Sequence, residues 1–260
     1  MLAKERQDII AELIKDNGAV TTAELMRRFK VSVETIRKDL MILEKGNFLK
    51  RVHGGAVTLK EMPKFLDLSG RNEENGDLKK ELSETAVKFV HEGDIIGIDS
   101  GSTAIFFAHA LKQSFKQLTV VTASTDIFDI LCRHENFKLI LCGGEFMKSE
   151  NAFYGFLTCE TLKKLHVSKA FIFSSAVSLK YGIADFSAEL CEVQKHFIDC
   201  ADKVFVLADS TKFEQSALIK VCDIDESYTY VTDTSLPSDL KKLYKENGIN
   251  VITAEDIKND

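Results

Sequence analysis

Short apolar runs and amphipathic segments alternate along residues 78–260, and this alternation restricts the fold more than any other feature of the chain. The apolar runs are candidate strands at residues 95–98, 118–121, 138–141, 170–173, 204–207, 228–231 and 251–252. The amphipathic segments are candidate helices, and the clearest are residues 83–90, 104–111, 188–200 and 238–246. Near-continuous apolar strands separated by helices predict an α/β fold with a mainly parallel sheet that is covered on both faces.

Residues 31–44 have the pattern of a capped helix with one apolar face and one cationic face. Ser32 can cap the first turn, because its hydroxyl can accept an unpaired backbone N–H two or three residues further on. At about 100° per residue, one buried stripe consists of Ile36, Leu40 and Leu43. The opposite face consists of Glu34, Arg37, Lys38 and Met41, with Thr35 at its flank. The exposed face is therefore polar and mostly positive, although an amphipathic helix of any soluble protein could look similar.

The neighbouring segments favour a DNA-binding interpretation of this helix. Thr21-Thr22-Ala23-Glu24 has the pattern of a capping box and opens a short helix that ends at Lys30. Two short helices with a tight connection are typical of the helix-turn-helix, whose second helix lies in the DNA major groove. Gly46 ends the second helix, and residues 48–59 predict a β-hairpin with the turn His53-Gly54-Gly55. With a first helix at residues 4–15, residues 1–59 are predicted to form a winged helix-turn-helix.

Charge is distributed unevenly along the chain. Residues 1–60 hold 12 Lys and Arg against 8 Asp and Glu, a net charge of +4, and the formal charge of −6 for the whole chain leaves −10 for the remainder. A basic small domain on an acidic larger one confines the attraction for DNA phosphates to the first domain.

The composition argues against several classes of protein. No run of about 20 apolar residues is present, as a membrane-spanning helix would need, and the N-terminus has no apolar signal region. The six cysteines form no Cys-x-x-Cys pair and have no nearby histidine at a spacing typical of zinc sites. We therefore expect a cytoplasmic protein with reduced thiols, no membrane association, no metal and no cofactor.

The run Thr35-Ile36-Arg37-Lys38-Asp39-Leu40, followed by His53-Gly54-Gly55-Ala56, is a specific signature. This region resembles the DNA-binding domain of the DeoR family of bacterial transcription regulators. In this interpretation Thr35, Arg37 and Lys38 read or clamp the major groove, and the wing contacts the DNA backbone. The expected DNA-binding residues are Ser32, Glu34, Thr35, Arg37, Lys38, Lys50, Arg51 and His53.

Small and polar residues follow the predicted strands at their carboxyl ends, where open α/β sheets bind ligands. Asp99-Ser100-Gly101-Ser102-Thr103 leads straight into a helix, and such a turn offers N–H groups and hydroxyls to an anion. Thr122 and Ser124 follow the next strand, and Lys212 follows a later one as a candidate cation. Asp99 or Glu189 could accept hydrogen bonds from sugar hydroxyls. Each motif alone also occurs as an ordinary turn or a solvated side chain, so only their joint placement favours a ligand site.

The pieces 98–103, 121–124, 142–145 and 208–213 resemble the sensor domain of the same family, over residues 71–254. The resemblance implies a fold similar to ribose-5-phosphate isomerase and a phosphorylated sugar or sugar derivative as the effector. It also implies that residues 100–103 form the phosphate loop and that Lys212 belongs to the same site. Three parts of the chain depart from the family pattern. Ala123 stands where asparagine is common, Ser174-Ser175-Ala176-Val177 replaces a glycine-rich loop, and the segment from Lys148 to Phe153 is atypical.

Two hypotheses about function follow. The first is a DNA-binding transcription regulator, a repressor of sugar-metabolism genes that is controlled by a phosphorylated sugar. Such a regulator is expected to be a homodimer or homotetramer, because small basic domains bind weakly alone. The alternative is an isomerase-like enzyme that uses Glu189 as acid/base and Lys212 as cation. The complete DNA-binding domain favours the regulator, with residues 60–77 as the linker to a sensor domain at 78–260.

Overall fold

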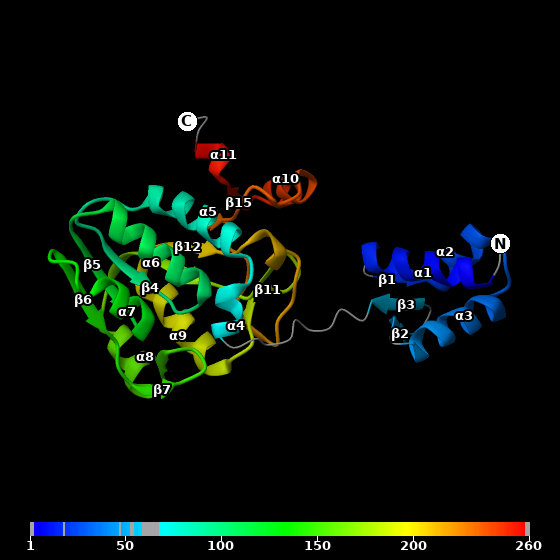
Figure 1. The fold of residues 1–260 in the computed structure, drawn as a ribbon, viewed down its shortest axis with the longest axis horizontal. Coiled ribbons are helices and arrows are strands. Elements are labelled where there is room, and N and C mark those ends of the chain that lie inside the picture. The colour runs from blue at the N-terminus through cyan, green and yellow to red at the C-terminus, as the bar shows by residue number, and fades with distance from the viewer. Residues whose placement is uncertain (1–2, 18, 47, 53–54, 59–67, 258–260) are drawn as a thin grey trace. The chain divides into compact units, whose positions relative to one another are not determined.

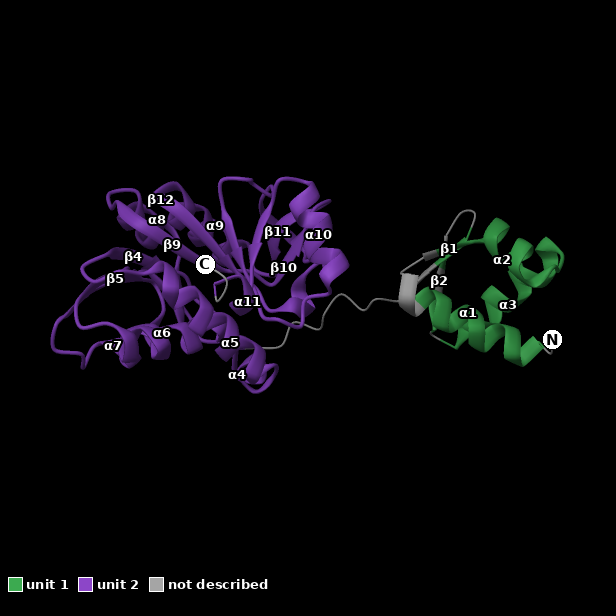
Figure 2. Ribbon diagram, turned by 90° about the horizontal axis from the view of Figure 1, so that it is seen from above, with its two compact units in different colours: residues 1–64 green, residues 65–260 purple. Residues whose placement is uncertain are grey.

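Residues Met1–Lys64 and Phe65–Asp260 form separate units in the computed structural model of this chain, unit 1 and unit 2 (Figure 2). The structure describes residues 3–17, 19–46, 48–52, 55–58 and 68–257. Within these ranges, no helix combines the length and the apolar character that crossing a membrane requires. All six cysteines are free thiols.

The described part of unit 1 consists of helices and one small antiparallel sheet (Figure 1). The helices are α1 (Ala3–Asn17), α2 (Thr22–Phe29) and α3 (Val33–Lys45). The sheet has the order β1-β3-β2, with β1 (Ala19–Thr21), β2 (Leu49–Val52) and β3 (Gly55–Thr58). The predicted capping box is confirmed, because Thr21 Oγ1 accepts the Glu24 N–H at 3.2 Å and Glu24 Oε2 accepts the Thr21 N–H at 2.9 Å. The two predicted helices therefore follow each other across residues 30–32.

The sheet of unit 1 differs from the predicted hairpin in two respects. Strand β1 adds a third strand, in which Val20 pairs with Ala56 of β3. Gly55 begins β3 and does not lie in the turn, because a Cβ atom at this position would lie 2.1 Å from the Val20 carbonyl oxygen. Only glycine allows the two backbones to approach so closely. His53 and Gly54, the rest of the predicted turn, lie outside the described residues.

A seven-stranded sheet lies at the centre of unit 2, with the order β15-β14-β12-β9-β4-β5-β6 and parallel pairing throughout. The strands are β4 (Ile95–Ile98), β5 (Leu118–Thr122), β6 (Phe137–Leu141), β9 (Val167–Phe173), β12 (Ala201–Leu207), β14 (Thr229–Val231) and β15 (Asn250–Ile252). Each strand overlaps one of the seven apolar runs. The prediction of a mainly parallel α/β sheet is therefore confirmed.

Helices cover both faces of this sheet (Figure 1). One layer consists of α5 (Gly76–Ala86), η1 (Val87–Phe89), α6 (Ser102–Ser114) and α7 (Thr125–Leu131). It buries a core that includes Leu82 and Phe107. The other layer consists of α8 (Phe156–Leu162), α9 (Ala188–Asp199) and α10 (Ser238–Glu246). Its separate core includes Leu162, Phe197 and Tyr244.

Shorter elements surround the sheet, and the sequence analysis did not predict them. Two small antiparallel sheets contain β7 (Glu145–Met147), β8 (Ala152–Tyr154), β10 (Ala176–Ser178), β11 (Gly182–Asp185) and β13 (Ile219–Cys222). The short helices are α4 (Leu68–Glu73), η2 (Ser210–Lys212) and α11 (Ala254–Ile257).

Helix α4 and the start of α5 fall within residues 60–77, the predicted linker. Leu68 is 4 % exposed, and its N–H donates to the Ser149 carbonyl oxygen at 3.2 Å. Residues 68–77 are therefore part of unit 2, and residues 60–67 lie outside the described residues.

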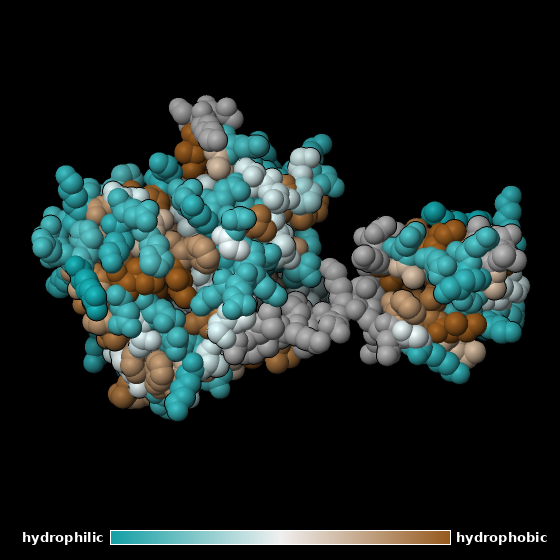
Figure 3. All heavy atoms as spheres, in the orientation of Figure 1, coloured by the Kyte–Doolittle hydropathy of each residue, from teal (hydrophilic) through white to brown (hydrophobic). Residues whose placement is uncertain are grey.

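The surface seen in Figure 3 is mainly hydrophilic, with smaller hydrophobic patches between the polar side chains. Three large apolar side chains of unit 2 that are strongly exposed belong to β7 and the first turn of α8. They are Phe146 at 45 %, Phe156 at 75 % and Leu157 at 64 %.

Candidate DNA interface and effector site

Helix α3 presents its predicted cationic face to solvent. The exposed side chains of this face include Glu34, Arg37 and Lys38. The opposite stripe, which packs into the core of unit 1, consists of Ile36, Leu40 and Leu43, all at most 5 % exposed. As the amphipathic pattern predicted, the adjacent cations Arg37 and Lys38 face solvent on the second helix.

Ser32 and Thr35 define the first turn of α3. Ser32 Oγ accepts the Thr35 N–H at 3.3 Å and lies 3.1 Å from Thr35 Oγ1. The predicted cap is confirmed, and it fixes the N-terminal end of α3, a few residues before Arg37.

A buried ion pair joins α3 to α1. The Asp39 carboxylate, 2 % exposed, accepts hydrogen bonds from Arg6 Nε at 2.6 Å and from Gln7 Nε2 at 2.9 Å. Arg6 and Gln7 are each 8 % exposed. The sequence analysis did not find this contact because its partners lie 33 and 32 residues apart. The available signal was a carboxylate, Asp39, directly beside the apolar stripe residue Leu40.

Arg51 of β2 connects the predicted wing to the C-terminal end of α3. The Arg51 N–H donates to Glu44 Oε1 at 2.8 Å, and Arg51 Nε donates to Glu44 Oε2 at 2.6 Å. The Arg51 side chain is 44 % exposed, so part of the guanidinium still faces solvent. The Lys50 side chain and the whole of His53, the other predicted wing contacts, lie outside the described residues.

The loop after β4 has the geometry of an anion site. Gly101 has φ 137°, in the region that favours glycine, and is the N-cap residue of α6. It has no side chain to cap the helix, so no side-chain cap occupies the backbone N–H groups of the first turn. Ser100, Ser102 and Thr103 are 8 %, 3 % and 1 % exposed, and Thr103 Oγ1 has no hydrogen-bond partner among the described residues. These groups at the positive end of a helix dipole suit a phosphate.

Two lysines of unit 2 have lowered pKa values. Lys212, at the end of η2, places Nζ 3.8 Å from Asp209 Oδ2, and its side chain is 22 % exposed. Burial lowers the pKa of Lys212, against the opposing effect of Asp209. Lys79, only 2 % exposed, donates through Nζ to the carbonyl oxygens of Glu74, at 2.6 Å, and Arg71. Burial and then the charge of Lys212 lower the pKa of Lys79 to about 8. A bound anion would stabilise both ammonium groups.

Sequence reasoning missed Lys79 and Arg71. The Arg71 side chain is 23 % exposed and pairs with Glu150, whose side chain is 2 % exposed. Arg71 fell within the predicted linker, where glycine and asparagine interrupt any helical pattern. Lys79 had a usable signal, because it lies three and four residues before the buried Leu82 and Ser83 on the inner stripe of α5. A lysine in such a position is almost never buried without partners.

A buried hydrogen-bond network joins Asp99, in the loop before α6, to α9 and β11. Asp99, 1 % exposed, accepts a hydrogen bond from Gln194 Nε2 of α9 at 2.8 Å, and the same nitrogen lies 3.4 Å from Asp185 Oδ2. Asp185 ends β11 and belongs to the electrostatic surroundings of Lys212. Burial raises the pKa of Asp99 to about 7. Asp185 therefore shares the Gln194 amide with Asp99 and, through its charge, opposes the lowering of the Lys212 pKa.

Thr122 and Ser124, two other predicted effector residues, make local capping bonds. Thr122 Oγ1 accepts the Ser124 N–H at 3.1 Å, and Ser124 Oγ accepts the Ile127 N–H at 3.4 Å at the start of α7. Both residues are buried. Their oxygens therefore have a structural use that needs no ligand.

Glu189 is exposed and lies in the first turn of α9, where Ser187 Oγ donates to its Oε2 at 2.8 Å. Among the described residues, no hydrogen bond or ion pair joins Glu189 to Lys212. The Glu189 carboxylate thus accepts from a hydroxyl of its own helix turn.

Two of the departures from the family pattern have different surroundings. Ala123 is 2 % exposed, and its carbonyl oxygen accepts the Phe153 N–H at 2.8 Å. Ser175 Oγ donates to Asp185 Oδ1 at 2.9 Å. Ser174 is fully buried, and its Oγ has no hydrogen-bond partner among the described residues. The serine loop therefore adds hydroxyl groups beside the buried carboxylates.

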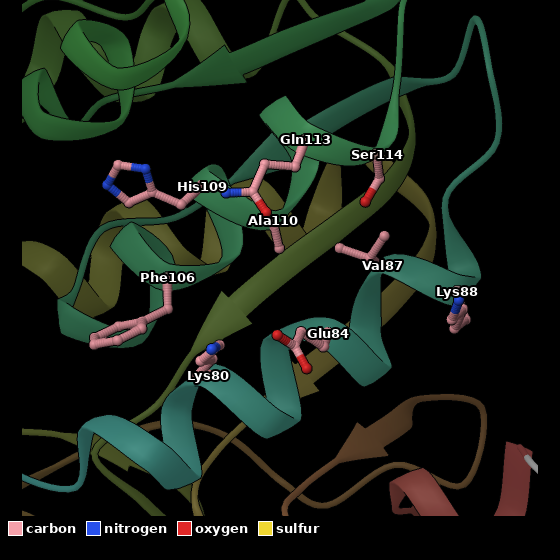
Figure 4. Close-up of a pocket in the computed structure, with 9 residues that line it drawn as sticks. All are labelled: Lys80, Glu84, Val87, Lys88, Phe106, His109, Ala110, Gln113 and Ser114. Atoms are coloured by element: carbon pink, nitrogen blue, oxygen red, sulfur yellow. The ribbon is translucent and has the colours of Figure 1, made fainter.

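A separate groove of about 520 Å³ lies between α5 and α6 (Figure 4). Its lining consists of Lys80, Glu84, Val87, Lys88, Phe106, His109, Ala110, Gln113 and Ser114. Lys80 is exposed, whereas the preceding Lys79 is buried against backbone carbonyls. Adjacent lysines of α5 thus occupy different environments, which makes Lys80 a matched control for the lysines of the effector site.

Both units match models of known domains. Residues 6–62 match a DeoR-like helix-turn-helix domain, and residues 74–234 match a DeoR C-terminal sensor domain. The chain is 29 % identical over 247 residues to the L-fucose operon activator of Haemophilus influenzae, covering 95 % of this chain and 98 % of that protein. It is 31 % identical over 238 residues to the lactose phosphotransferase system repressor of Lactococcus lactis, covering 91 % and 93 %. A solved structure, ribose 5-phosphate isomerase A from Neisseria gonorrhoeae, matches with a TM-score of 0.41 and 21 % identity over 56 % of this chain and 55 % of the isomerase.

Proposed function

Because the chain belongs to the DeoR family and is a DNA-binding transcriptional regulator, we propose that it is a repressor of sugar-metabolism genes. In this proposal α3 reads the operator, and a phosphorylated sugar bound in unit 2 changes the affinity of unit 1 for that operator. The relatives include an activator and a repressor of sugar operons, by their names.

The exposed cationic face of α3 is the observation that carries the DNA-binding half of this proposal. Arg37 and Lys38 point outward, while the buried Asp39 beside them fixes the helix to α1. An arginine can donate two parallel hydrogen bonds to guanine, and a lysine can contact guanine or a phosphate. Supporting contacts are assigned to Ser32, Glu34, Thr35, Lys50, Arg51 and His53.

Arg37→Ala is expected to lower operator affinity by about 1–3 kcal/mol and to relax the base preference at one operator position, because a bidentate base contact is lost. Fluorescence anisotropy with the operator and with single-base variants of it measures both effects. Lys4→Ala removes another exposed cation of unit 1 and serves as the control. Unchanged affinity and unchanged preference in Arg37→Ala would show that α3 does not read bases through this residue.

The effector half of the proposal is supported by the phosphate loop and its cations. A bound phosphate would be stabilised by several groups. They are the backbone N–H groups at the start of α6, the Thr103 hydroxyl, and two lysines with lowered pKa values. A ligand shifts an equilibrium only by its different affinity for the two states. The effector must therefore bind one of the two forms, DNA-bound or DNA-free, more tightly than the other.

A phosphorylated sugar is expected to change operator affinity, whereas the same sugar without phosphate is not. Anisotropy titrations of the full chain against a panel of paired sugars and sugar phosphates measure this difference. Thermal melting gives an independent measurement, because a ligand at about 100 times its dissociation constant adds roughly 2.7 kcal/mol to the stability. Equal effects of phosphorylated and unphosphorylated sugars would contradict the assignment of residues 100–103 as a phosphate loop.

We also propose that the protein acts as a homodimer or homotetramer, which light scattering of the full chain would measure. A single small winged helix binds DNA weakly, and a symmetric assembly can place several copies on repeated half-sites. The exposed Phe146, Phe156 and Leu157 provide an apolar area in unit 2 that such an assembly could cover.

A further inference from the structure

Two buried carboxylates of unit 2 share one side-chain amide. Asp99 at the end of β4 and Asp185 at the end of β11 are 1 % and 8 % exposed. The Gln194 Nε2 atom lies 2.8 Å from an oxygen of the first and 3.4 Å from an oxygen of the second. The amide therefore donates to both acids, so the two carboxylates lie within hydrogen-bond distance of the same nitrogen. Two negative groups in such a position repel each other unless a positive group joins them.

Polar atoms around this pair lack partners. Gln194, 2 % exposed, directs its amide toward both carboxylates, and its Oε1 has no hydrogen-bond partner among the described residues. The Ser174 hydroxyl, one residue before the Ser175 that donates to Asp185, is fully buried and is also unpaired within the described part of the chain. Buried polar groups in folded proteins are nearly always paired, so unpaired ones next to a proposed binding site indicate a polar ligand.

The groups beside Asp99 and Asp185 are mainly acceptors of hydrogen bonds. The ionised carboxylates and Gln194 Oε1 accept, and the Ser175 hydroxyl and the Phe186 N–H are already used as donors to Asp185 Oδ1 at 2.9 and 2.7 Å. A ligand group that fits here must therefore supply several donors. An ammonium group supplies three donors and a positive charge.

The surrounding charges favour a positive ligand group over a neutral one. The cations of this part of unit 2 are Arg71, Lys79 and Lys212, and the buried carboxylates are Asp99, Glu150, Asp185 and Asp209. A phosphate monoester adds about −1.5 to −2 charge near pH 7. Binding a phosphate alone would thus increase the excess of negative charge in a mostly buried site.

We infer that the effector is a phosphorylated amino sugar, whose phosphate occupies the loop at residues 100–103 and whose ammonium group donates to the remaining acceptor positions of Asp99, Asp185 and Gln194 Oε1. This inference rests on the proposed function, because it names the class of sugar phosphate that the sensor binds. A hexose phosphate would present a hydroxyl with a single donor to the same carboxylates. An N-acetylated amino sugar would present an amide with one donor and no charge.

Paired ligands test the inference on the full chain. Isothermal titration at pH 7.5 compares glucosamine 6-phosphate with glucose 6-phosphate and galactosamine 6-phosphate with galactose 6-phosphate. In at least one pair, the amine is expected to bind about tenfold or more tightly than its hydroxyl counterpart, since hydrogen bonds to charged groups are roughly twice as strong as neutral ones. N-acetylation of the better amine is expected to remove this advantage.

Asp185→Asn is expected to reduce the preference for the amine to less than about threefold while phosphate binding persists, because it removes one charge and keeps a polar group. Glu192→Gln removes an exposed carboxylate from the same helix as Gln194 and is expected to leave the preference unchanged. If Asp185→Asn fails to fold, the wild-type comparison of paired ligands decides by itself.

The outcomes separate the inference from the function on which it rests. Binding of a hexose phosphate as tightly as its amine in both pairs would overturn the amino-sugar inference and leave the sugar-phosphate sensor standing. Absence of binding by every phosphorylated sugar would overturn both. Equal preference for the amine in wild type and in a folded Asp185→Asn would overturn the assignment of the ammonium group to this carboxylate pair.

Discussion

Asp39→Ala is expected to lower the free energy of unfolding of unit 1 by about 3–5 kcal/mol, because removal of one partner leaves Arg6 as a buried charge without compensation. Arg6 is 8 % exposed, and its Nε donates to Asp39 Oδ2 at 2.6 Å. Gln7 loses its contact with the same carboxylate. A unit of this size has little stability to lose, since natural domains are stable by only about 5–15 kcal/mol. The fraction of molecules with a disrupted N-terminal unit at 37 °C should therefore be much larger in the variant than in wild type.

The expected result for DNA binding follows from the position of Asp39. The residue is 2 % exposed and cannot itself contact DNA without rearrangement. Loss of operator affinity in Asp39→Ala would thus report the displacement of α3 and its outward Arg37 and Lys38. Asp39→Asn keeps the shape of the side chain and one acceptor, so a smaller loss is expected.

Hydrogen exchange of the full chain measures this effect region by region, which matters because a protein with two units need not unfold in one step. Amides of α1 and α3 should exchange faster in Asp39→Ala, while those of the unit 2 sheet should keep their wild-type rates. Asp8→Ala on α1, whose carboxylate is 61 % exposed, is the matched control and should change stability by less than about 0.5 kcal/mol. Wild-type exchange of α3 in Asp39→Ala would show that the buried pair does not hold the helix.

The elements that the sequence predicted correctly are those defined by local patterns. The central strands have continuous apolar runs, such as Ile95–Ile98, because both faces of the sheet are buried. The helix starts at Thr21 and Ser32 follow from capping, which involves residues only three positions apart. Such interactions can be read from the chain without knowledge of its topology.

The contacts that could not be predicted join residues far apart in the sequence. Gln194 and Asp99 lie 95 residues apart, and Arg71 and Glu150 lie 79 apart. Strand β1 is only three residues long, so it shows no alternation from which to recognise it. The sequence therefore predicted the local part of the candidate effector site, residues 99–103. It did not predict the contributions proposed for Gln194, Asp185 and Lys79, which belong to other elements.

The sequence analysis offers Glu189 as an acceptor for sugar hydroxyls, and in the structure its carboxylate accepts from the nearby Ser187 hydroxyl. A capping carboxylate and a ligand-binding carboxylate have the same local sequence pattern. Burial distinguishes them here, because Glu189 is exposed while Asp99 and Asp185 are not.

Lys212→Met is expected to weaken binding of the phosphorylated effector by about 10- to 150-fold, the equivalent of the 1.5–3 kcal/mol of a hydrogen bond to a charged group. The reason is electrostatic, since Lys212 is a largely buried cation and the phosphate is proposed to bind beside it. Operator affinity without effector should stay at the wild-type value, because the residue belongs to unit 2. The regulator would then remain insensitive to effector concentrations that act on wild type.

The stability of the effector-free protein separates a functional lysine from a structural one. Burial lowers the pKa of Lys212, so the charged form is less favourable in the folded protein than in the unfolded chain at neutral pH. Replacement by methionine, of similar length and without charge, removes this unfavourable contribution. It also removes the cation that lies 3.8 Å from the buried Asp209 carboxylate, and these two effects oppose each other. The melting temperature of unit 2 should therefore stay close to that of wild type, although the response to effector is lost.

Lys80→Met is the matched control, because Lys80 is a surface lysine of α5 that lines the separate groove in Figure 4. Effector titrations of the three proteins, read by melting temperature and by operator anisotropy, give both quantities. Loss of response together with a lower melting temperature would identify Lys212 as structural. A wild-type response in Lys212→Met would remove the lysine from the effector site and leave Lys79 and the α6 N-terminus as the remaining phosphate contacts.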